Sequence, residues 1–295
     1  MAYLRGIRYP QHSMDERIDR TIVAGGAALG AAVAAVARAP RAAALFCNID
    51  GTITAIHARP AETRVPASVL DVLDELQRRL GLLAIVSGRG VEDARRLAGV
   101  DGAAYIGTHG LEMRTARGVT IVDRGVERFL PDVRAIAEIA AHDLDHERLG
   151  IVLEDKRTIV ALHYRLARDP AATHHEILRH VVEPARARGL AVLTGHGVIE
   201  VAPPLAVTKG SAMRHLLTGG EYTAALTLGD DLTDVTGFKA VRDWGERDGR
   251  RTACAVAVVG PETPAPVREE ADAQVDGPQG AASLLERLLR AIDKR

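Results

Sequence analysis

The sequence predicts an α/β protein with a parallel-sheet core into which a smaller α/β domain is inserted. Apolar runs without polar alternation, such as those at residues 43–47 and 82–86, recur between helical patterns, as in parallel sheets covered on both faces. Between residues 113 and 203 the runs shorten and begin to alternate, which is typical of antiparallel strands with one solvated face. We therefore expect a core over 40–112 and 204–295, a cap domain over 113–203 and an N-terminal helical extension over 1–39.

The individual elements follow from the same patterns, taken in chain order. The first strand ends near residue 47, and apolar residues at helical spacing over 65–81 predict a helix that Gly81 closes. A strand at 82–86, a short helix at 91–99 and a strand at 103–107 come next. After the cap, which includes a helix over 169–189, the pattern returns with a helix from Thr208 and strands over 224–231 and 253–260.

Composition and charge exclude some classes of function. The 295 residues are 47% hydrophobic and 3% aromatic and carry a net charge of -1, whereas nucleic-acid-binding domains are usually basic and stack bases on aromatic rings. Cys47 and Cys254 lie in apolar runs, which favours buried, reduced thiols over a disulfide. We therefore expect a cytoplasmic protein that binds no nucleic acid.

An uncharged segment at residues 21–37 follows several arginines and raises the question of an export signal or a membrane span. It consists mostly of Ala and Gly, which supply little apolar area to drive insertion into a membrane. It also begins late in the chain and follows an acidic pair, unlike a signal peptide. We expect a helix that lies against the domain and no membrane association, with export as the alternative.

Polar side chains gather where three predicted parallel strands end, at residues 48–52, 87–89 and 229–234. Because ligands bind at the carboxyl edge of open α/β sheets, we expect these clusters to form one site. Thr208 can cap the following helix and leave Lys209 in its first turn, where an anion is favoured. The lysine, hydroxyls and backbone amides suit a phosphate group, and the carboxylates suit a hard cation such as Mg²⁺.

In this order, the motifs N-I-D-G-T (48–52), S-G-R (87–89), Lys209 and G-D-D-L-T-D (229–234) resemble those of the haloacid dehalogenase-type phosphatases. More specific motifs are GTHGLE at 107–112, EDKRTIVALHYR at 154–165, GHGVIEVAPP at 195–204 and GDDLTDVTGF at 229–238. They resemble the trehalose-6-phosphate phosphatase family over residues 40–290. The resemblance implies a Rossmann-like haloacid dehalogenase core with a cap, and an Mg²⁺-dependent enzyme that converts trehalose 6-phosphate to trehalose.

The resemblance also implies roles for individual residues. The side chain at position 48 attacks phosphorus to give an aspartyl-phosphate, and Asp50 acts as the acid and then as the base. The catalytic positions are Asn48, Asp50 and Lys209, and the Mg²⁺ ligands are Asn48, the carbonyl of Asp50, Asp230 and Asp231, with Asp234 in support. The phosphate-binding positions are Gly51, Thr52, Ser87, Gly88, Arg89 and Lys209, and the sugar-binding positions are His109, Glu154, Lys156, Arg165 and Glu200.

One position departs from the family pattern, because Asn48 stands where the nucleophilic aspartate is expected. An amide oxygen is a poor nucleophile, and asparagine in place of aspartate removes one negative charge from the Mg²⁺ site. Because asparagine has nearly the same shape as aspartate, we expect the fold and the pocket to stay intact. The change is either a deliberate substitution or a natural variant, and the sequence leaves both open. His196 also stands where the family often has a lysine.

These observations lead to two classes of function. The first is a sugar-phosphate phosphatase that is impaired in this chain, and the second is a non-catalytic protein that binds a sugar phosphate. Within the first class, phosphatases of sucrose phosphate or mannosyl-phosphoglycerate share the core, and the cap motif at 154–165 argues against them. The expected partner is a small-molecule substrate, and no sequence pattern sets an oligomeric state, so a monomer is the default.

Overall fold

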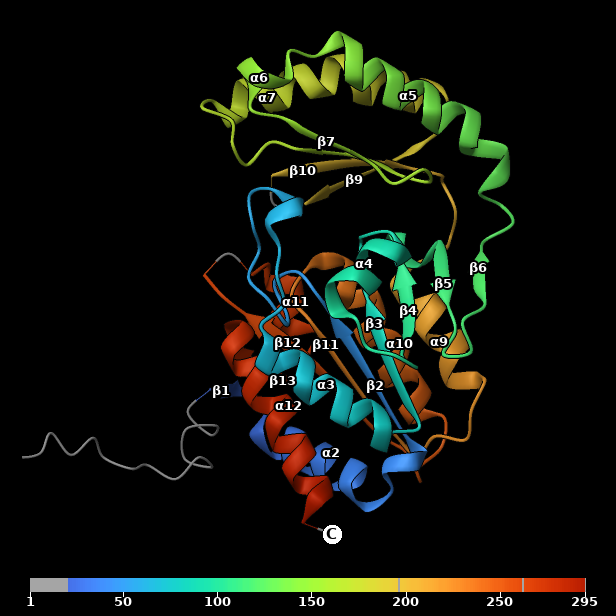
Figure 1. Ribbon diagram of the computed structural model, residues 1–295, viewed down its shortest axis with the longest axis vertical. Coiled ribbons are helices and arrows are strands. Elements are labelled where there is room, and N and C mark those ends of the chain that lie inside the picture. Colours follow the sequence, from blue (N-terminus) through green and yellow to red (C-terminus); the bar gives the residue numbers. More distant parts are fainter. Residues whose placement is uncertain (1–20, 196, 262, 295) are drawn as a thin grey trace, which may run out of the picture.

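The computed structural model describes residues 21–195, 197–261 and 263–294. The described chain forms a nine-stranded sheet and, above it in Figure 1, a separate four-stranded sheet. The large sheet is mainly parallel, and the small sheet is antiparallel. The fold class predicted from the sequence, an α/β core with a smaller inserted α/β cap, is confirmed.

Parallel strands form the centre of the large sheet, and antiparallel strands lie at both edges. Its strands, in spatial order, are β1 (Ile22–Ala24), β13 (Ala273–Asp276), β12 (Thr252–Val259), β11 (Ala224–Gly229), β2 (Ala43–Asn48), β3 (Leu82–Val86), β4 (Ala104–Gly107), β5 (Glu112–Arg114) and β6 (Thr120–Val122). Neighbours from β13 to β4 are parallel, whereas β1, β5 and β6 pair antiparallel with their neighbours. The core strands expected from the apolar runs are therefore confirmed.

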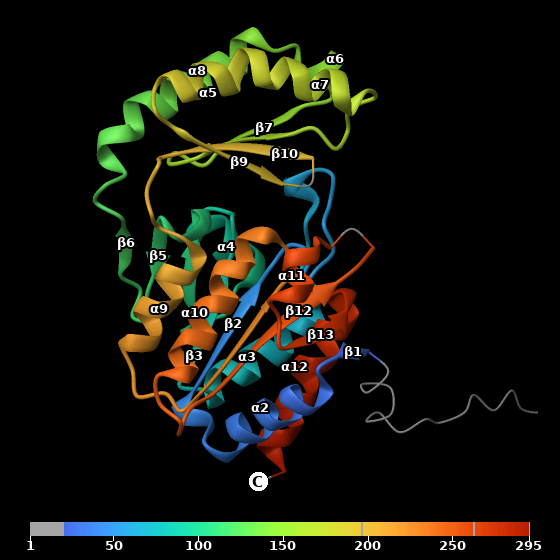
Figure 2. The same cartoon turned by 180° about the vertical axis from the view of Figure 1, so that it is seen from behind.

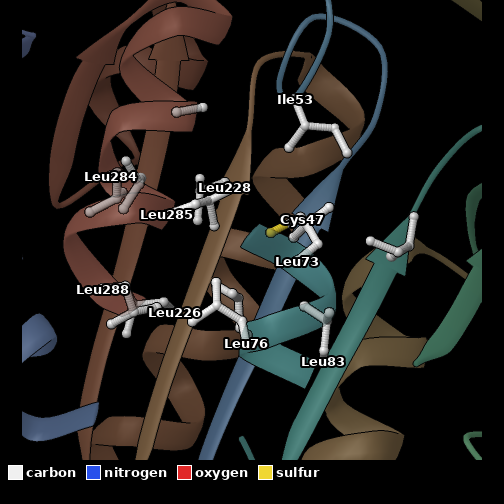
Figure 3. Close-up of a cluster of buried hydrophobic side chains, with 14 of the residues drawn as sticks. Cys47, Ile53, Leu73, Leu76, Leu83, Leu226, Leu228, Leu284, Leu285 and Leu288 are labelled. Atoms are coloured by element: carbon white, nitrogen blue, oxygen red, sulfur yellow. The ribbon is translucent and has the colours of Figure 1, made fainter. Parts of the chain in front are cut away.

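Helices cover both faces of this sheet. On one face lie α2 (Gly26–Arg38), α3 (Ala67–Arg79), α4 (Val91–Ala98) and α12 (Gly277–Asp293), and on the other lie α9 (Lys209–Thr218), α10 (Val235–Glu246) and α11 (Ala265–Glu269). Figure 3 shows Leu284, Leu285 and Leu288 of α12 beside Leu226 and Leu228 of β11. All five side chains are buried. The apolar face of the amphipathic helix α12 therefore packs on β11, a strand whose sequence lacks polar alternation because both faces of the sheet are covered.

The cap begins later than the sequence predicts. We expect it from residue 113, but β5 and β6 extend the large sheet from β4 as far as Val122. The chain reverses at Thr108–Gly110, where His109 has a positive φ of 56°, and this reversal brings residues 112–114 alongside β4. Residues 112–122 therefore belong to the core sheet, and the helical part of the cap starts with η4 (Glu127–Phe129).

The described part of the N-terminal segment is built into the core. Leu29, Val33 and Val36 of α2 are buried against the sheet, so the helix predicted near residues 21–37 does lie against the domain. The first residues of the segment form β1 instead, which pairs with β13 at the sheet edge. The rest of the expected extension, residues 1–20, lies outside the described residues. Across the described ranges, every helix is too short or too polar to span a bilayer.

Both cysteines are buried thiols, as the sequence predicts. Cys47 lies on β2 and Cys254 on β12, and both are free of disulfide bonds. Burial raises the pKa of each thiol to about 12, so both stay protonated at neutral pH.

The cap is an antiparallel sheet with helices on the face turned away from the core (Figures 1 and 2). Its strands, in spatial order, are β7 (Val152–Asp155), β8 (Val160–His163), β10 (Val198–Ala202) and β9 (Ala191–Gly195). Its helical segments include α5 (Leu130–Asp143), α6 (His146–Leu149), α7 (Pro170–Ile177), the π-turn η5 (Leu178–Val182) and α8 (Glu183–Ala187). The helix expected over 169–189 is confirmed, and its wide π-turn comes just before Pro184, which has no N–H to donate.

Candidate active site

The carboxyl ends of β2, β3 and β11 lie side by side, because these strands are neighbours in the parallel sheet. The three clusters predicted at strand ends therefore meet at one edge, and Figure 1 shows that this edge faces the cap sheet. A cavity lies here between the core and the cap. The predicted site residues that line it are Asn48, Asp50, Ser87, Gly88, Arg89, His109, Glu154, Lys156, Arg165, Glu200, Lys209, Asp230 and Asp231.

Gly51 and Thr52, which the sequence predicts as phosphate ligands, contact Asp230 instead of lining this cavity. The buried Thr52 hydroxyl donates to Asp230 Oδ1 at 2.7 Å. Gly51 has a φ of 79°, and a Cβ atom at this position would lie 1.9 Å from Asp230 Oδ2. Glycine is therefore required here, because the loop after β2 presses its backbone against the carboxylate.

Asn48 is the last residue of β2, and its buried side chain reaches the loop that follows β11. Its Nδ2 atom donates to the backbone carbonyl of Asp50 at 3.1 Å, to Asp230 Oδ1 at 3.0 Å and to Asp234 Oδ2 at 3.2 Å. The orientation of the amide follows from these partners, because a carbonyl and two carboxylates all accept hydrogen bonds. Asn48 therefore links the first polar cluster directly to the third.

Lys209 is the first residue of α9, and Thr208 caps this helix, as the sequence predicts. The Thr208 hydroxyl accepts from the Ser211 N–H, and the Ser211 hydroxyl accepts from the Thr208 N–H in return. The side chain of Lys209 is 3% exposed, and its Nζ lies 2.7 Å from Asp234 Oδ1. Burial alone would lower the pKa of Lys209, but the charge of Asp234 outweighs it and raises that pKa.

Two of the three carboxylates in the third cluster, those of Asp230 and Asp234, differ in their surroundings. Asp234 accepts hydrogen bonds from Lys209 and from the backbone N–H groups of Asp230 and Asp231. Burial raises the pKa of Asp230 well above its ordinary value, and the negative charge of Asp234 raises it further. Asp230 therefore ionises readily only with a further positive charge nearby, which suits a bound cation.

The oxygen atoms expected to hold Mg²⁺ do converge, but the amide of Asn48 stands where they meet. The Asp50 carbonyl and Asp230 Oδ1 both face Asn48 Nδ2, which is a hydrogen-bond donor and no ligand for a hard cation. These residues fit Mg²⁺ when the amide presents its Oδ1 atom instead. Within residues 21–195, 197–261 and 263–294, no three His, Cys, Asp or Glu side chains form a metal-binding group on their own.

The sequence predicts Arg89 as a phosphate ligand, but the structure places its side chain on Asp50. Its Nε and Nη2 atoms lie 2.7 and 2.8 Å from the two carboxylate oxygens of Asp50. The other guanidinium N–H groups donate to Asp93, Thr63 and the carbonyl of Pro60. These bonds use every donor of the guanidinium group, so Arg89 orients the expected acid–base residue.

On the cap side, Lys156 and Glu200 form a buried ion pair in which Nζ and Oε1 lie 2.6 Å apart. Both also reach the core, because Lys156 donates to the carbonyl of Gly88 at 2.9 Å and Glu200 Oε2 lies 2.7 Å from His109 Nε2. Burial alone would raise the pKa of Glu200, but Lys156 and His109 outweigh it and hold that pKa well below its usual range. The pair therefore stays charged and ties the cap to the core.

The other predicted sugar-binding residues lie beside this pair. Glu154 Oε2, on β7, lies 3.0 Å from His163 Nε2 and 3.8 Å from Lys156 Nζ. Arg165 follows β8 and lines the same cavity. The departure at His196 lies outside the described residues.

Sequence reasoning missed the residues that support Arg89. Thr63 and Asp93 accept hydrogen bonds from its guanidinium group and so help to hold Asp50. Asp93 lies in the first turn of α4, four residues after Arg89, which precedes this helix, and this spacing could have suggested the contact. No local pattern marks Thr63, because it comes from the loop before α3.

Other missed residues line the cavity directly. Ile56 and His57 come from the loop between β2 and α3, which stands up toward the cap in Figure 1. Ile56 is exposed on this loop, and an exposed isoleucine is a weak sign of a binding surface. The sequence offers no stronger sign for these two residues. His163 lies inside the cap motif at 154–165, so the motif itself contained this signal.

Comparison with known proteins identifies the family. A family model described as trehalose-phosphatase matches residues 46–263. The chain belongs to the trehalose-phosphatase family. It is 31% identical over 258 residues to the trehalose-phosphate phosphatase of Mycobacterium tuberculosis, and this match covers 83% of the chain and 63% of that protein. The chain spans between 18% and 63% of the lengths of the curated relatives it matches.

Solved structures show the same fold. The structure of the C-terminal domain of Candida albicans trehalose-6-phosphate phosphatase superposes with a TM-score of 0.72 at 21% identity, covering 91% of this chain and 97% of that chain. A haloacid dehalogenase-like hydrolase from Bacteroides thetaiotaomicron gives a TM-score of 0.58 at 15% identity, covering 83% of this chain and 98% of that chain. The haloacid dehalogenase-type fold implied by the sequence is therefore confirmed.

Proposed function

We propose that this chain carries the site of a trehalose 6-phosphate phosphatase, a phosphoric monoester hydrolase that releases trehalose. The observation that carries the proposal is the cavity lined both by the strand-end cluster of the core and by the charged cluster of the cap. A phosphorylated disaccharide has one anionic end and one neutral end rich in hydroxyl groups. The core cluster suits the first end and the cap cluster suits the second.

On the core side, Ser87 and Lys209 hold the phosphoryl group. Lys209 is buried and charged, so it stabilises the negative charge that develops on the phosphoryl oxygens. Asp50 protonates the leaving sugar oxygen and then takes a proton from the attacking water. Arg89 holds both carboxylate oxygens of Asp50 and fixes the direction from which it acts.

On the cap side, Glu154, Lys156, Arg165 and Glu200 bind the sugar, with His109 beside them. In the described structure the charged groups of Lys156 and Glu200 bond to each other and to the core. Sugar hydroxyls can donate to the carboxylates and accept from the ammonium group, so they replace these contacts without a change of charge. The cap therefore reads hydroxyl positions and not an additional charge on the substrate.

We propose Mg²⁺ as the cofactor, held by the side chain at position 48, the carbonyl of Asp50 and Asp230, with Asp231 and Asp234 in support. When bound, it offsets the charge of the phosphoryl group and polarises one of its oxygens. Support comes from the excess negative charge around Asp230, whose pKa is raised by burial and by Asp234.

Asn48 separates this chain from an active phosphatase of that kind. With aspartate at position 48, the carboxylate attacks phosphorus, the sugar leaves, and water then hydrolyses the aspartyl-phosphate. Loss of a covalent nucleophile lowers turnover by on the order of 10⁴ to 10⁶. The second candidate is therefore a non-catalytic sugar-phosphate-binding protein, and it is favoured by the full set of hydrogen bonds that Asn48 makes.

The test is the substitution Asn48→Asp, assayed for phosphate release from trehalose 6-phosphate with Mg²⁺ present. We expect turnover to rise by about 10⁴ or more over the unaltered chain. Gln279→Glu, an exposed amide-to-carboxylate change on α12, is the matched control and should leave turnover unchanged. A folded Asn48→Asp variant without trehalose 6-phosphate hydrolysis would contradict the proposal.

Three further statements stay predictions. The protein is expected to be cytoplasmic and monomeric, and its partner is expected to be a small molecule, with no binding to nucleic acid or to a membrane. Sedimentation of the purified chain measures its oligomeric state, and fractionation of cells measures its location. A substrate panel with other sugar phosphates tests the choice of sugar, because the core contacts the phosphate common to all of them.

A further inference from the structure

The side-chain nitrogen of Asn48 lies where oxygen atoms of three residues converge. The backbone carbonyl of Asp50, Asp230 Oδ1 and Asp234 Oδ2 lie 3.1, 3.0 and 3.2 Å from Nδ2. An amide nitrogen carries two hydrogens, so three acceptors around it are more than it can serve with one straight bond each. Oxygen atoms gathered around one point in this way are the surroundings that a hard cation prefers.

We propose that the Asn48 amide takes the place of a divalent cation in this chain. It joins the loop after β2 to the loop after β11 without a metal. Mg²⁺ enters only when the amide group rotates so that Oδ1, in place of Nδ2, faces these oxygen atoms. Because Asn48 is the single asparagine of the 295-residue sequence, this assignment concerns one identifiable side chain. The inference stands independently of which phosphate ester the protein binds or hydrolyses.

The partners of the amide explain why it prefers this orientation. If the amide turned by half a rotation, Oδ1 would face the Asp50 carbonyl and the two carboxylates with no hydrogen between them. Electrostatic repulsion among oxygen atoms in a buried site disfavours that arrangement. A cation among the same oxygens reverses the preference, because Oδ1 then becomes a ligand.

Two neighbouring contacts also involve these carboxylates, and one of them joins the same two loops. Asp234 is tied to Lys209, and Asp230 Oδ1 also accepts from Thr52. Asn48, at the end of β2, contacts the carboxylates of both Asp230 and Asp234 through its side-chain nitrogen. With aspartate at position 48, these carboxylates would face a third one, and a cation would be needed to offset the repulsion among them.

The first experiment observes the amide itself. Protein labelled with ¹⁵N only in the asparagine side chain shows a single NH₂ pair, and protein labelled in glutamine, which includes the exposed Gln279, provides the reference for exposed amides. We expect the metal-free Asn48 pair to exchange with water at least tenfold more slowly than the Gln279 pair, and saturating MgCl₂ to move it to a new position. Exchange as fast as that of Gln279, or Mg²⁺ binding without any change of the pair, would overturn the proposal.

The second experiment measures melting temperatures with and without MgCl₂, and it uses no turnover, so it is separate from the test of the phosphatase. Without metal, Asn48→Asp should melt about 5 °C or more below the unaltered chain, and Mg²⁺ should restore it while shifting the unaltered chain far less. The exposed change Gln279→Glu should behave like the unaltered chain. Equal Mg²⁺ shifts for the unaltered chain and Asn48→Asp would contradict the assignment, as would a metal-free variant as stable as the unaltered chain.

Discussion

The cavity is lined by two clusters of charged side chains. Burial alone would raise the pKa of a carboxylate in either cluster, but the neighbouring charges shift the two pKa values in opposite directions. In the cap cluster, Glu200 bonds to Lys156 and lies beside His109, and the pKa of Glu200 falls well below its usual range. In the core cluster, Asp230 accepts from the neutral amide of Asn48, and burial together with the charge of Asp234 raises its pKa. The neighbours of each carboxylate therefore make one cluster balanced and leave the other short of positive charge.

This difference separates the two tasks of the proposed site. A cluster that is short of positive charge gains from a cation, and a cation in turn attracts a phosphate group. A balanced cluster offers donors and acceptors without net charge, which suits the hydroxyl groups of a sugar. A variant that removes a charge from the core cluster and a variant that removes one from the cap cluster should therefore differ in two ways. They should differ in how much stability or activity is lost, and in which substrate is affected.

Lys209→Ala should produce the largest loss of stability. It leaves the carboxylate of Asp234 buried without its cation, and breaking a buried pair in this way lowers the free energy of unfolding by about 3 to 5 kcal/mol. Urea denaturation measures this change. The matched control is Lys239→Ala, because Lys239 pairs with Glu270 while 55% exposed, and we expect a change within about 1 kcal/mol. Equal losses for the two lysines would show that Asp234 is neutralised in some other way.

A smaller and more selective effect is expected from the cap. In the Asn48→Asp background, Glu200→Ala or Glu154→Ala should lower kcat/KM for trehalose 6-phosphate by about 100-fold, because lost sugar contacts weaken transition-state binding. Hydrolysis of p-nitrophenyl phosphate, which is too short to reach the cap, should change by less than about threefold. Glu176→Ala on α7 is a matched carboxylate change outside the cavity and should affect neither reaction. Equal losses on both substrates would mean that the cap does not read the sugar.

Much of the core cluster could be predicted from the sequence for a simple geometric reason. Asn48, Ser87 and Asp230 each lie next to the end of an apolar run, and parallel neighbours place such ends at one edge. The capped helix that begins at Lys209 was also readable, because Thr208 and Ser211 are spaced as a capping pair. Local sequence therefore determined which side chains meet in the core.

The contacts across the cavity could not be predicted in the same way. Lys156 bonds to Gly88, and Glu200 bonds to His109, so each contact joins the cap to a distant segment of the core and depends on how the cap is seated. Arg89 was predicted as a phosphate ligand because its motif gives no hint that Asp50 and Asp93 occupy its donors. The start of the cap was placed too early because the edge strands β5 and β6 are only three residues long each and lie within a polar stretch of sequence, like cap strands.

The smallest effect concerns pH. The pKa of Glu200 is lower in the folded protein than its unfolded value of about 4.3, so its contribution to stability is present above that value and is lost as the pH falls below it. The difference in unfolding free energy between the unaltered chain and Glu200→Gln should therefore be constant from pH 7 to about pH 5 and should shrink at lower pH. Urea titrations at several pH values measure it. A difference that grows on acidification would mean that Glu200 is not held in its charged form.

The central claim is that the core cluster and the cap cluster bind two ends of one ligand. Titration calorimetry on the unaltered chain with Mg²⁺ tests it directly, because Asn48 prevents turnover from obscuring the binding. We expect trehalose 6-phosphate to bind with a dissociation constant of about 1 μM or lower, roughly -8 kcal/mol, and at least about 100-fold more tightly than inorganic phosphate or trehalose alone. Trehalose 6-phosphate that binds no more tightly than inorganic phosphate would contradict it, because the cap would then contribute nothing to recognition.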